Sequence, residues 1–238
     1  MQRLLEICCY SVEDARRAQA AGANRIELCA GRPEGGTTPS IGVLERASSV
    51  IQIPVFPMVR PRGGDFCYGP DEFAAMRRDV EAIAELGFPG LVLGILRPDA
   101  SVDVERTTEL IDLARSVNPE VSITFHRAFD SARSPLISYA DVAATGADRL
   151  LTSGQRPTAP EGADLIGELI ALQRSRRPER GPIVMPGSGV RPANVLTFLD
   201  LGALEVHSTA TSSSVAPLDP ATVAALADIV HDYQGVGS

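Results

Sequence analysis

Basic side chains, cysteines and long apolar runs are all scarce in this sequence of 238 residues. Lysine and arginine together number 22 against 30 aspartates and glutamates, so the formal net charge is −8 at pH 7. Proteins that bind nucleic acid or anionic membranes need positive charge to neutralise phosphate groups. We therefore expect neither nucleic acid nor a membrane as a partner, although a few placed arginines could hold a small anion.

The four cysteines make a poor disulfide framework, because Cys8 and Cys9 are neighbours in a long chain. The longest apolar runs, such as residues 90–96, fall far short of the ~20 residues of a membrane helix. Acidic residues such as Glu6 and Glu13 interrupt the N-terminus before a signal peptide could form. These scarcities predict a cytoplasmic protein in a reducing compartment.

The composition is that of an ordinary globular protein, with 44% hydrophobic and 22% charged residues. Surface scaling allows a chain of this length to bury about 70% of its surface on folding. We expect a single domain over residues 1–238.

Short β-rich runs alternate with amphipathic helical patterns along the whole chain. The predicted strands are 4–9, 25–29, 53–59, 90–96, 121–126, 149–153, 183–186 and 204–207. The predicted helices are 11–21, 41–50, 70–86, 104–117, 136–145, 160–176, 193–201 and 220–232. Eight such units predict the α/β fold of a (β/α)8 TIM barrel. A doubly wound open sheet is less suitable, because the first strand is not followed by a glycine-rich turn.

Three of the predicted strands share a pattern of glutamate, an apolar residue, and then cysteine or histidine. The pairs are Glu6 with Cys8, Glu27 with Cys29, and Glu205 with His207. A strand period of two residues places both members of each pair on one face. In a closed barrel the first, second and eighth strands are neighbours, so these side chains should cluster inside.

This polar interior permits two interpretations. Glu6, Glu27, His126 and His207 could exchange protons with a substrate. Alternatively, the carboxylates could belong to a buried charge network that only sets the barrel geometry. In either case they need counter-ions, and Arg60 and Arg62 beyond the third strand are the predicted ones.

Cys8 and Cys29 should lie in matching register on adjacent strands. Two thiolates in that arrangement could bind a soft ion such as Cu(I). The alternative is that they are simply small buried side chains, as cysteines usually are. Cys9 should face the helices, and Cys67 falls in a predicted loop.

Candidate anion-binding residues lie in the loops after the third, seventh and eighth strands. They are Arg60, Arg62, Gly187, Ser188, Gly189 and Ser208. Barrels commonly hold phosphate at the seventh and eighth loops, and a glycine-rich turn before a helix suits an anion. An inter-loop salt bridge is the other explanation for the two arginines. No catalytic Ser-His-Asp order, zinc-ligand spacing or P-loop is found.

Several stretches together closely resemble the CutC family, described as copper homeostasis proteins. They include LEICCYS, GANRIELC, PRGGDF, TFHRAFD, LTSG, MPGSGV and LEVHSTA, and the match runs from about residue 3 to residue 210. The resemblance implies a TIM barrel, a cytoplasmic location, a homodimer, and copper, with Cys8 and Cys29 as its candidate ligands. The polar positions of the family pattern fall on Glu6, Glu27, Arg60, Arg62, Asp65, His126, Arg127, His207 and Ser208.

Two functions remain open. The first is a cytosolic protein that binds or traffics Cu(I) through Cys8 and Cys29. The second is a barrel enzyme, a lyase or isomerase, acting on a small anionic or phosphorylated metabolite. Cysteines on rigid strands and only four methionines suit a copper chaperone poorly. Compared with longer members of the family, the segment 212–214 after the eighth strand is also short, so any lid built there would be truncated.

Overall fold

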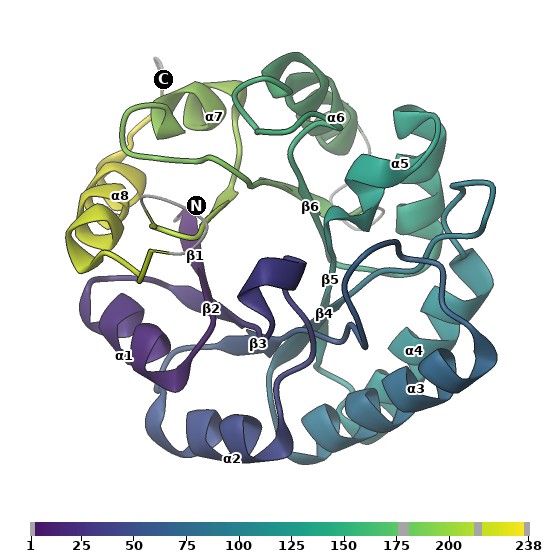
Figure 1. Ribbon diagram of the computed structural model, residues 1–238. Coiled ribbons are helices and arrows are strands. Elements are labelled where there is room, and N and C mark those ends of the chain that lie inside the picture. Colours follow the sequence, from purple (N-terminus) through teal and green to yellow (C-terminus); the bar gives the residue numbers. More distant parts are fainter. Residues whose placement is uncertain (1–2, 176–180, 212–215, 236–238) are drawn as a thin grey trace.

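Eight parallel strands form a closed barrel surrounded by helices in a computed structural model, which describes residues 3–175, 181–211 and 216–235 (Figure 1). The strands are β1 (Leu4–Cys9), β2 (Arg25–Leu28), β3 (Val55–Pro57), β4 (Gly90–Leu93), β5 (Ser122–Phe125), β6 (Arg149–Thr152), β7 (Ile183–Pro186) and β8 (Glu205–Ser208). The helices are α1 (Val12–Ala20), α2 (Ile41–Val50), α3 (Pro70–Glu85), α4 (Val104–Val117), α5 (Pro135–Ala144), α6 (Ala163–Ser175), α7 (Val195–Leu201) and α8 (Pro220–Asp232). Two short 3-10 helices, η1 (Arg32–Glu34) and η2 (Arg127–Ser131), follow β2 and β5. The predicted (β/α)8 barrel is confirmed.

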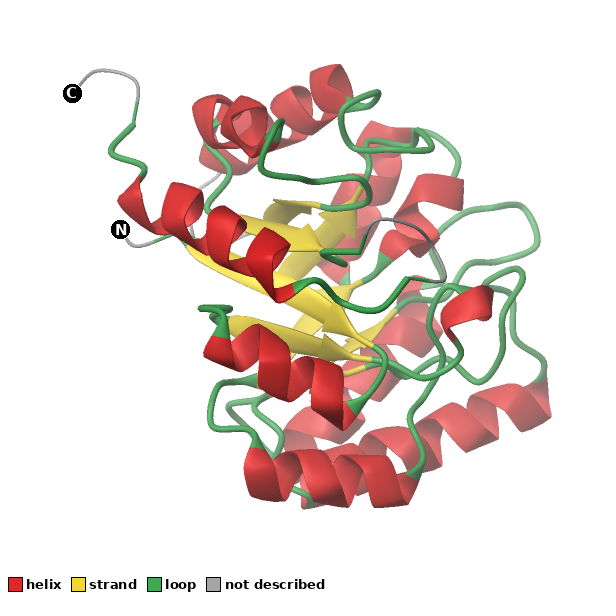
Figure 2. Ribbon diagram, turned by 60° about the vertical axis from the view of Figure 1, so that its left-hand side comes forward, coloured by secondary structure: helices red, strands yellow, loops and turns green. Residues whose placement is uncertain are grey.

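The barrel is hydrogen-bonded in two halves, with strand orders β3-β2-β1-β8 and β4-β5-β6-β7. The strands β3 and β4 are joined by an isolated β-bridge between Met58 and Val92. Next to it, the Val59 N–H donates to the Val92 carbonyl at 2.8 Å. On the other side β7 packs against β8. The ring is therefore closed, and the helices cover its outer face (Figure 2).

The predicted element boundaries hold to within a few residues, and the third strand differs most. The expected strand 53–59 pairs as a ladder only over Val55–Pro57. Proline has no N–H to donate, so Pro54 and Pro57 restrict regular pairing there. The segment 212–214 and the last residue of the predicted sixth helix lie outside the described residues.

Alternation along the strands separates two apolar regions. Outward side chains such as Ile7 and Cys9 join the large core between strands and helices. A smaller cluster lies inside the barrel and consists of Cys8, Cys29, Phe56, Met58 and Val92. Cys9 thus faces the helices, as the sequence predicted, while Cys8 faces inward.

No helix in the described ranges has both the length and the apolar character needed to cross a membrane.

Phe56 fills the end of the barrel interior where the strands begin. Its ring centroid lies 4.8 Å from the guanidinium carbon of Arg25 and 5.5 Å from that of Arg149. The ring also lies against the first residue of β4, where a Cβ on Gly90 would come within 2.3 Å of it. Glycine is required at residue 90 because the aromatic ring occupies the space of a side chain.

We predict that Gly90→Ala destabilises the protein by about 1–3 kcal/mol, because the added methyl group overpacks the interior against Phe56. Gly42→Ala in α2 is the matched control, since a Cβ there would meet nothing within 4 Å. That control should stabilise the fold by about 0.5 kcal/mol by restricting the unfolded chain. Urea unfolding midpoints measure both effects, and equal midpoints would contradict the packing argument.

Candidate functional site

Two interior glutamates form an ion-pair layer at the end of the barrel where the strands begin. The guanidinium of Arg25 donates to the carboxylates of both Glu6 and Glu205. Arg149 adds a second contact, its Nε lying 2.8 Å from Glu205 Oε2. Glu6, Arg25 and Glu205 are 0%, 2% and 6% exposed, so the centre of this layer is sealed from solvent, while the side chain of Arg149 is 16% exposed. The predicted counter-ions, Arg60 and Arg62, are therefore wrong for these two carboxylates.

The sequence did contain a signal for the true counter-ions. Arg25 is two residues from Glu27 on the same strand, so both side chains point inward. The register of β1 and β2 then places Glu6 directly beside Arg25. Arg149 is likewise the first residue of β6 and lies two residues before Leu151, which lines the barrel mouth. Its side chain therefore also points into the barrel.

The third glutamate pairs with a histidine in the middle of the barrel. Glu27 Oε2 lies 3.0 Å from His207 Nε2, and Glu6 Oε1 lies 3.9 Å from the same nitrogen. Burial disfavours both charged forms, but the mutual attraction outweighs it. The pKa of Glu27 is therefore lowered, and the pKa of His207 is raised well above its ordinary value. With His207 protonated, three carboxylates face two guanidiniums and one imidazolium, and the interior charge is balanced.

Cys8 and Cys29 lie side by side above this layer, on β1 and just after β2. Their Sγ atoms are 3.9 Å apart, and both residues are buried. With an oxygen of Glu27 they form a group of possible metal ligands whose atoms all lie within 4.8 Å of one another. The hydrogen bond with Cys8, together with burial, raises the pKa of the Cys29 thiol well above its ordinary value. The Cys29 thiol is therefore protonated until something displaces its proton.

His126 stands at the tip of β5 as a neutral side chain. Burial and the positive charge of Arg60 lower its pKa to about 3. Its Nδ1 accepts a hydrogen bond from the Ala128 N–H at 3.2 Å, so the proton of the neutral ring resides on Nε2. That Nε2 has no hydrogen-bond partner in the described part of the chain. The ring packs against Phe66 with centroids 5.1 Å apart.

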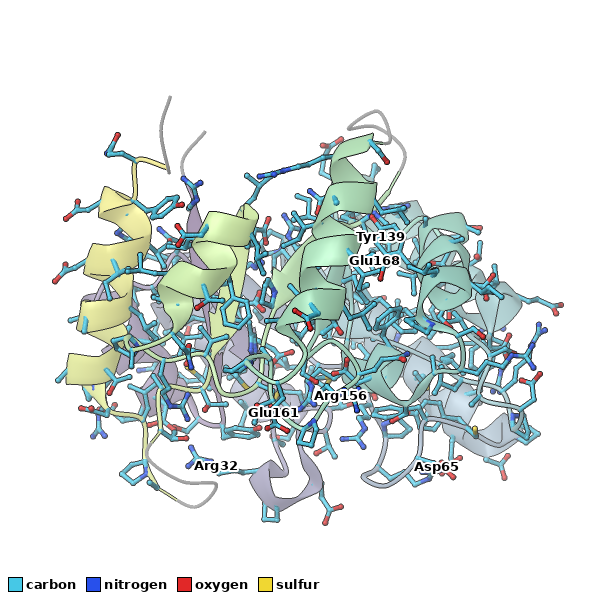
Figure 3. The ribbon with its side chains drawn as sticks, turned by 90° about the horizontal axis from the view of Figure 1, so that it is seen from above. Arg32, Asp65, Tyr139, Arg156, Glu161 and Glu168 are labelled. Atoms are coloured by element: carbon cyan, nitrogen blue, oxygen red, sulfur yellow. The ribbon has the colours of Figure 1, made fainter. Side chains whose placement is uncertain are left out.

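These side chains meet a cavity of about 560 Å³ at the end of the barrel where the strands finish. The predicted site residues that line it are Cys8, Glu27, Arg60, His126, Ser188, Gly189 and His207. Arg32, Arg127 and Arg191 also line it, together with Tyr10, Met58 and Phe66. Figure 3 shows Arg32, which belongs to η1, at the same end of the barrel as Asp65. The sequence had not indicated Arg191 or Met58 as site residues.

The other predicted residues do not border this cavity. Glu6 lies in the sealed layer, and Cys29 lies behind Cys8. Arg62 faces the surface, where its guanidinium pairs with Glu72 at 2.5 Å and Asp65 at 2.9 Å. That is the salt-bridge alternative that the sequence left open for this arginine.

The loop after β7 differs from a phosphate cradle on a helix. The N–H of Gly187 donates to the Thr152 carbonyl, and Ser188 Oγ donates to the Pro157 carbonyl. The helix α7 begins only at Val195, whose N–H donates to the Arg191 carbonyl. Ser208 Oγ donates to the Val190 carbonyl. The Gly187 N–H and the two serine hydroxyls are thus used in shaping the cavity wall.

Arg25→Met should destabilise the protein by about 3–5 kcal/mol, because it leaves buried carboxylates without their counter-ion. Arg77→Met is the control, since it removes a half-exposed ion pair with Glu109. Its effect should be small, because solvent screens such pairs. Equal unfolding midpoints for the two variants would show that the interior ion-pair layer stabilises the protein no more than a surface ion pair does.

The two interior histidines should differ in charge at pH 6.5. Nitrogen-15 NMR of the imidazoles should show His207 doubly protonated and His126 neutral with its proton on Nε2. The Glu27–His207 pair should stabilise the fold fully between pH 4.5 and pH 6.5, which are the ordinary pKa values of the two groups. Its contribution should fade as the pH rises through the raised pKa of His207, or falls through the lowered pKa of Glu27. In Glu27→Gln the pKa of His207 should fall, and an unchanged titration of His207 would refute the pairing.

Comparisons with known proteins agree with this architecture. A protein named "family protein CutC" from Erwinia tasmaniensis is 49% identical over 209 residues, which cover 88% of this chain and 79% of that protein. The crystal structure of a putative copper homeostasis protein CutC from Streptococcus agalactiae has a TM-score of 0.77 and 31% identity. That match covers 87% of this chain and 99% of the other.

More distant structures share the fold alone. KGPDC from Streptococcus mutans has a TM-score of 0.65 at 12% identity, covering 97% of this chain and 98% of that one. The family model that matches is far more specific, and it spans residues 3–212. The chain belongs to the CutC family.

Proposed function

We propose that this protein binds monovalent copper through the thiolates of Cys8 and Cys29. The observation that carries the proposal is the distance of 3.9 Å between the two Sγ atoms. Metal–thiolate bonds are about 2.3 Å long for zinc, so one ion of similar size can contact both sulfurs without movement of the backbone. The Streptococcus agalactiae relative, described as a putative copper homeostasis protein, supports the same choice of metal.

The donor set favours a soft ion. Thiolate ligands select Cu(I), whereas structural zinc sites are almost always four-coordinate. Within the described residues, one oxygen of Glu27 is the only other possible ligand atom grouped with the two cysteines. Met58 packs in the same interior cluster and adds a soft thioether beside the pair.

Copper would reach the pair from the barrel mouth. Cys8 and Met58 line the cavity, whereas Cys29 is 2% exposed and lies behind them. Because the Cys29 thiol has a raised pKa, the incoming ion must displace protons. Binding should therefore release protons and tighten as the pH rises.

An anaerobic titration of Cu(I) against a chromophoric competing chelator tests the proposal. The wild-type protein should bind one equivalent, and either Cys8→Ser or Cys29→Ser should weaken binding at least tenfold, which corresponds to about 1.4 kcal/mol. Cys67→Ser is the matched control, because this cysteine lies in a surface loop away from the pair. Affinity that is unchanged in Cys8→Ser and Cys29→Ser would overturn the proposed site. Affinity that falls as the pH rises would contradict binding by thiolates.

A further inference from the structure

We propose that the cavity at the barrel mouth also binds a small organic acid with two acidic groups, which Arg60 and Arg191 hold. The proposal does not rest on copper binding. It rests on two guanidinium groups that face this cavity and have no carboxylate partner among the described residues, and on a hydrogen-bond donor between them that is unused in the same ranges.

Arg60 is a buried cation held only by neutral groups. It is 5% exposed, and its guanidinium donates to the carbonyls of Glu34 at 2.7 Å, Gly36 at 2.9 Å and Gly64 at 2.9 Å. The ring of Phe66 stacks on it with 4.7 Å between the guanidinium carbon and the ring centroid. Across the described ranges it forms no ion pair. Carbonyl oxygens fix the orientation of a guanidinium but leave its net charge uncompensated.

Arg191 is held in the same way on the far side of the mouth. It donates to the carbonyls of Val190 at 2.9 Å and Thr211 at 2.7 Å, and to Ser208 Oγ at 3.3 Å. The structure gives this half-buried side chain no carboxylate within ion-pair distance in the ranges it describes. Both arginines are therefore positioned by the backbone and retain a full positive charge toward the cavity.

The other two arginines of the cavity wall contrast with this pair. Arg32 lies 3.5 Å from Asp14, and Arg127 lies 2.8 Å from Asp130, so both have carboxylate partners. Glu27, on the same wall, is neutralised by His207. The exposed Glu34 at the rim is solvated and does not reach either free cation within ion-pair distance.

Barrel topology fixes how far apart the two cations are placed. Arg60 follows β3 and Arg191 follows β7, and these strands are four apart in a ring of eight, on opposite sides of the mouth. Two guanidiniums held by loops on opposite sides of the mouth suit a ligand with an acidic group at each end. The cavity of about 560 Å³ suits such a molecule, since small-molecule sites typically span about 300–1,000 Å³.

His126 favours a ligand that carries a hydrogen-bond acceptor between its two acidic groups. It stands at the tip of β5, halfway round the barrel between β3 and β7. Its Nε2 is buried, has no partner in the described chain, and belongs to a ring that lines the cavity. A hydroxyl or carbonyl oxygen between the two acidic groups would accept the hydrogen bond from this donor. The ligand class is thus a short-chain hydroxy or keto acid with an acidic group at each end, either a dicarboxylate or a phosphorylated carboxylate.

Isothermal titration of the metal-free protein with three probes tests the inference: 3-phosphoglycerate, malate and inorganic phosphate. At least one of the two-ended probes should bind more tightly than inorganic phosphate, and whichever binds better identifies the acidic groups.

Arg191→Gln and Arg60→Gln should each weaken that binding about 10- to 100-fold, as expected for losing hydrogen bonds to a charged group. Because Arg60 also holds loop carbonyls, Arg191→Gln is the decisive variant should Arg60→Gln fail to fold. His126→Gln should weaken the binding of malate more than that of succinate, a fourth probe that lacks the hydroxyl group of malate.

Arg62→Gln is the matched control, since this arginine lies two residues from Arg60 but pairs with Glu72 at the surface. It should bind the probes like the wild type. Cys29→Ser should also retain anion binding, so loss of copper binding alone leaves this inference standing. Failure of both two-ended probes to bind better than phosphate would overturn it, as would unchanged affinity in Arg191→Gln.

Discussion

Three carboxylates sealed inside the barrel must be neutralised there, and much of the interior depends on this constraint. A buried carboxylate costs several kcal/mol unless a cation and hydrogen bonds compensate for lost hydration. Arg25 and Arg149 supply that compensation for Glu6 and Glu205, and Phe56 stacks against both guanidiniums. The aromatic ring in turn excludes any side chain at Gly90. The glycine on β4 is thus required, through Phe56, by the pairing of charges on β1, β2, β6 and β8.

The same constraint divides the barrel into two ends with different roles. Where the strands begin, the interior charges in the described ranges are paired and largely buried, which stabilises the fold. Where the strands finish, Arg60 and Arg191 are held by carbonyl groups. The sequence contains no lysine, so all of these cations are guanidiniums, which keep their charge when buried. Ligand binding in TIM barrels belongs to the second end, in agreement with this division.

One cavity therefore offers two kinds of chemistry on different walls. Cys8 and Met58 provide soft sulfur on the side of β1 and β3, and the guanidiniums of the β3 and β7 loops provide hard positive charge. A soft cation and an organic anion make different demands, and the proposed sites share no ligating side chain. Glu27 lies between them, and His207 holds it in place from β8.

The sequence by itself determined the number and order of the strands, because hydrophobic periodicity is a local signal. It also determined that Glu27, Cys8 and His207 face inward, since alternation along a strand has a period of two. The CutC resemblance likewise depended on local motifs. Only the tertiary structure decided which charges pair: Arg25 meets Glu6 through the register of neighbouring strands, and Arg149 on β6 reaches past β7 to Glu205 on β8. It also separated Arg60 from Arg62, two residues apart in one loop, placing one guanidinium inside the mouth and the other at the surface. Such pairings depend on distances between segments far apart in the chain, which no local pattern encodes.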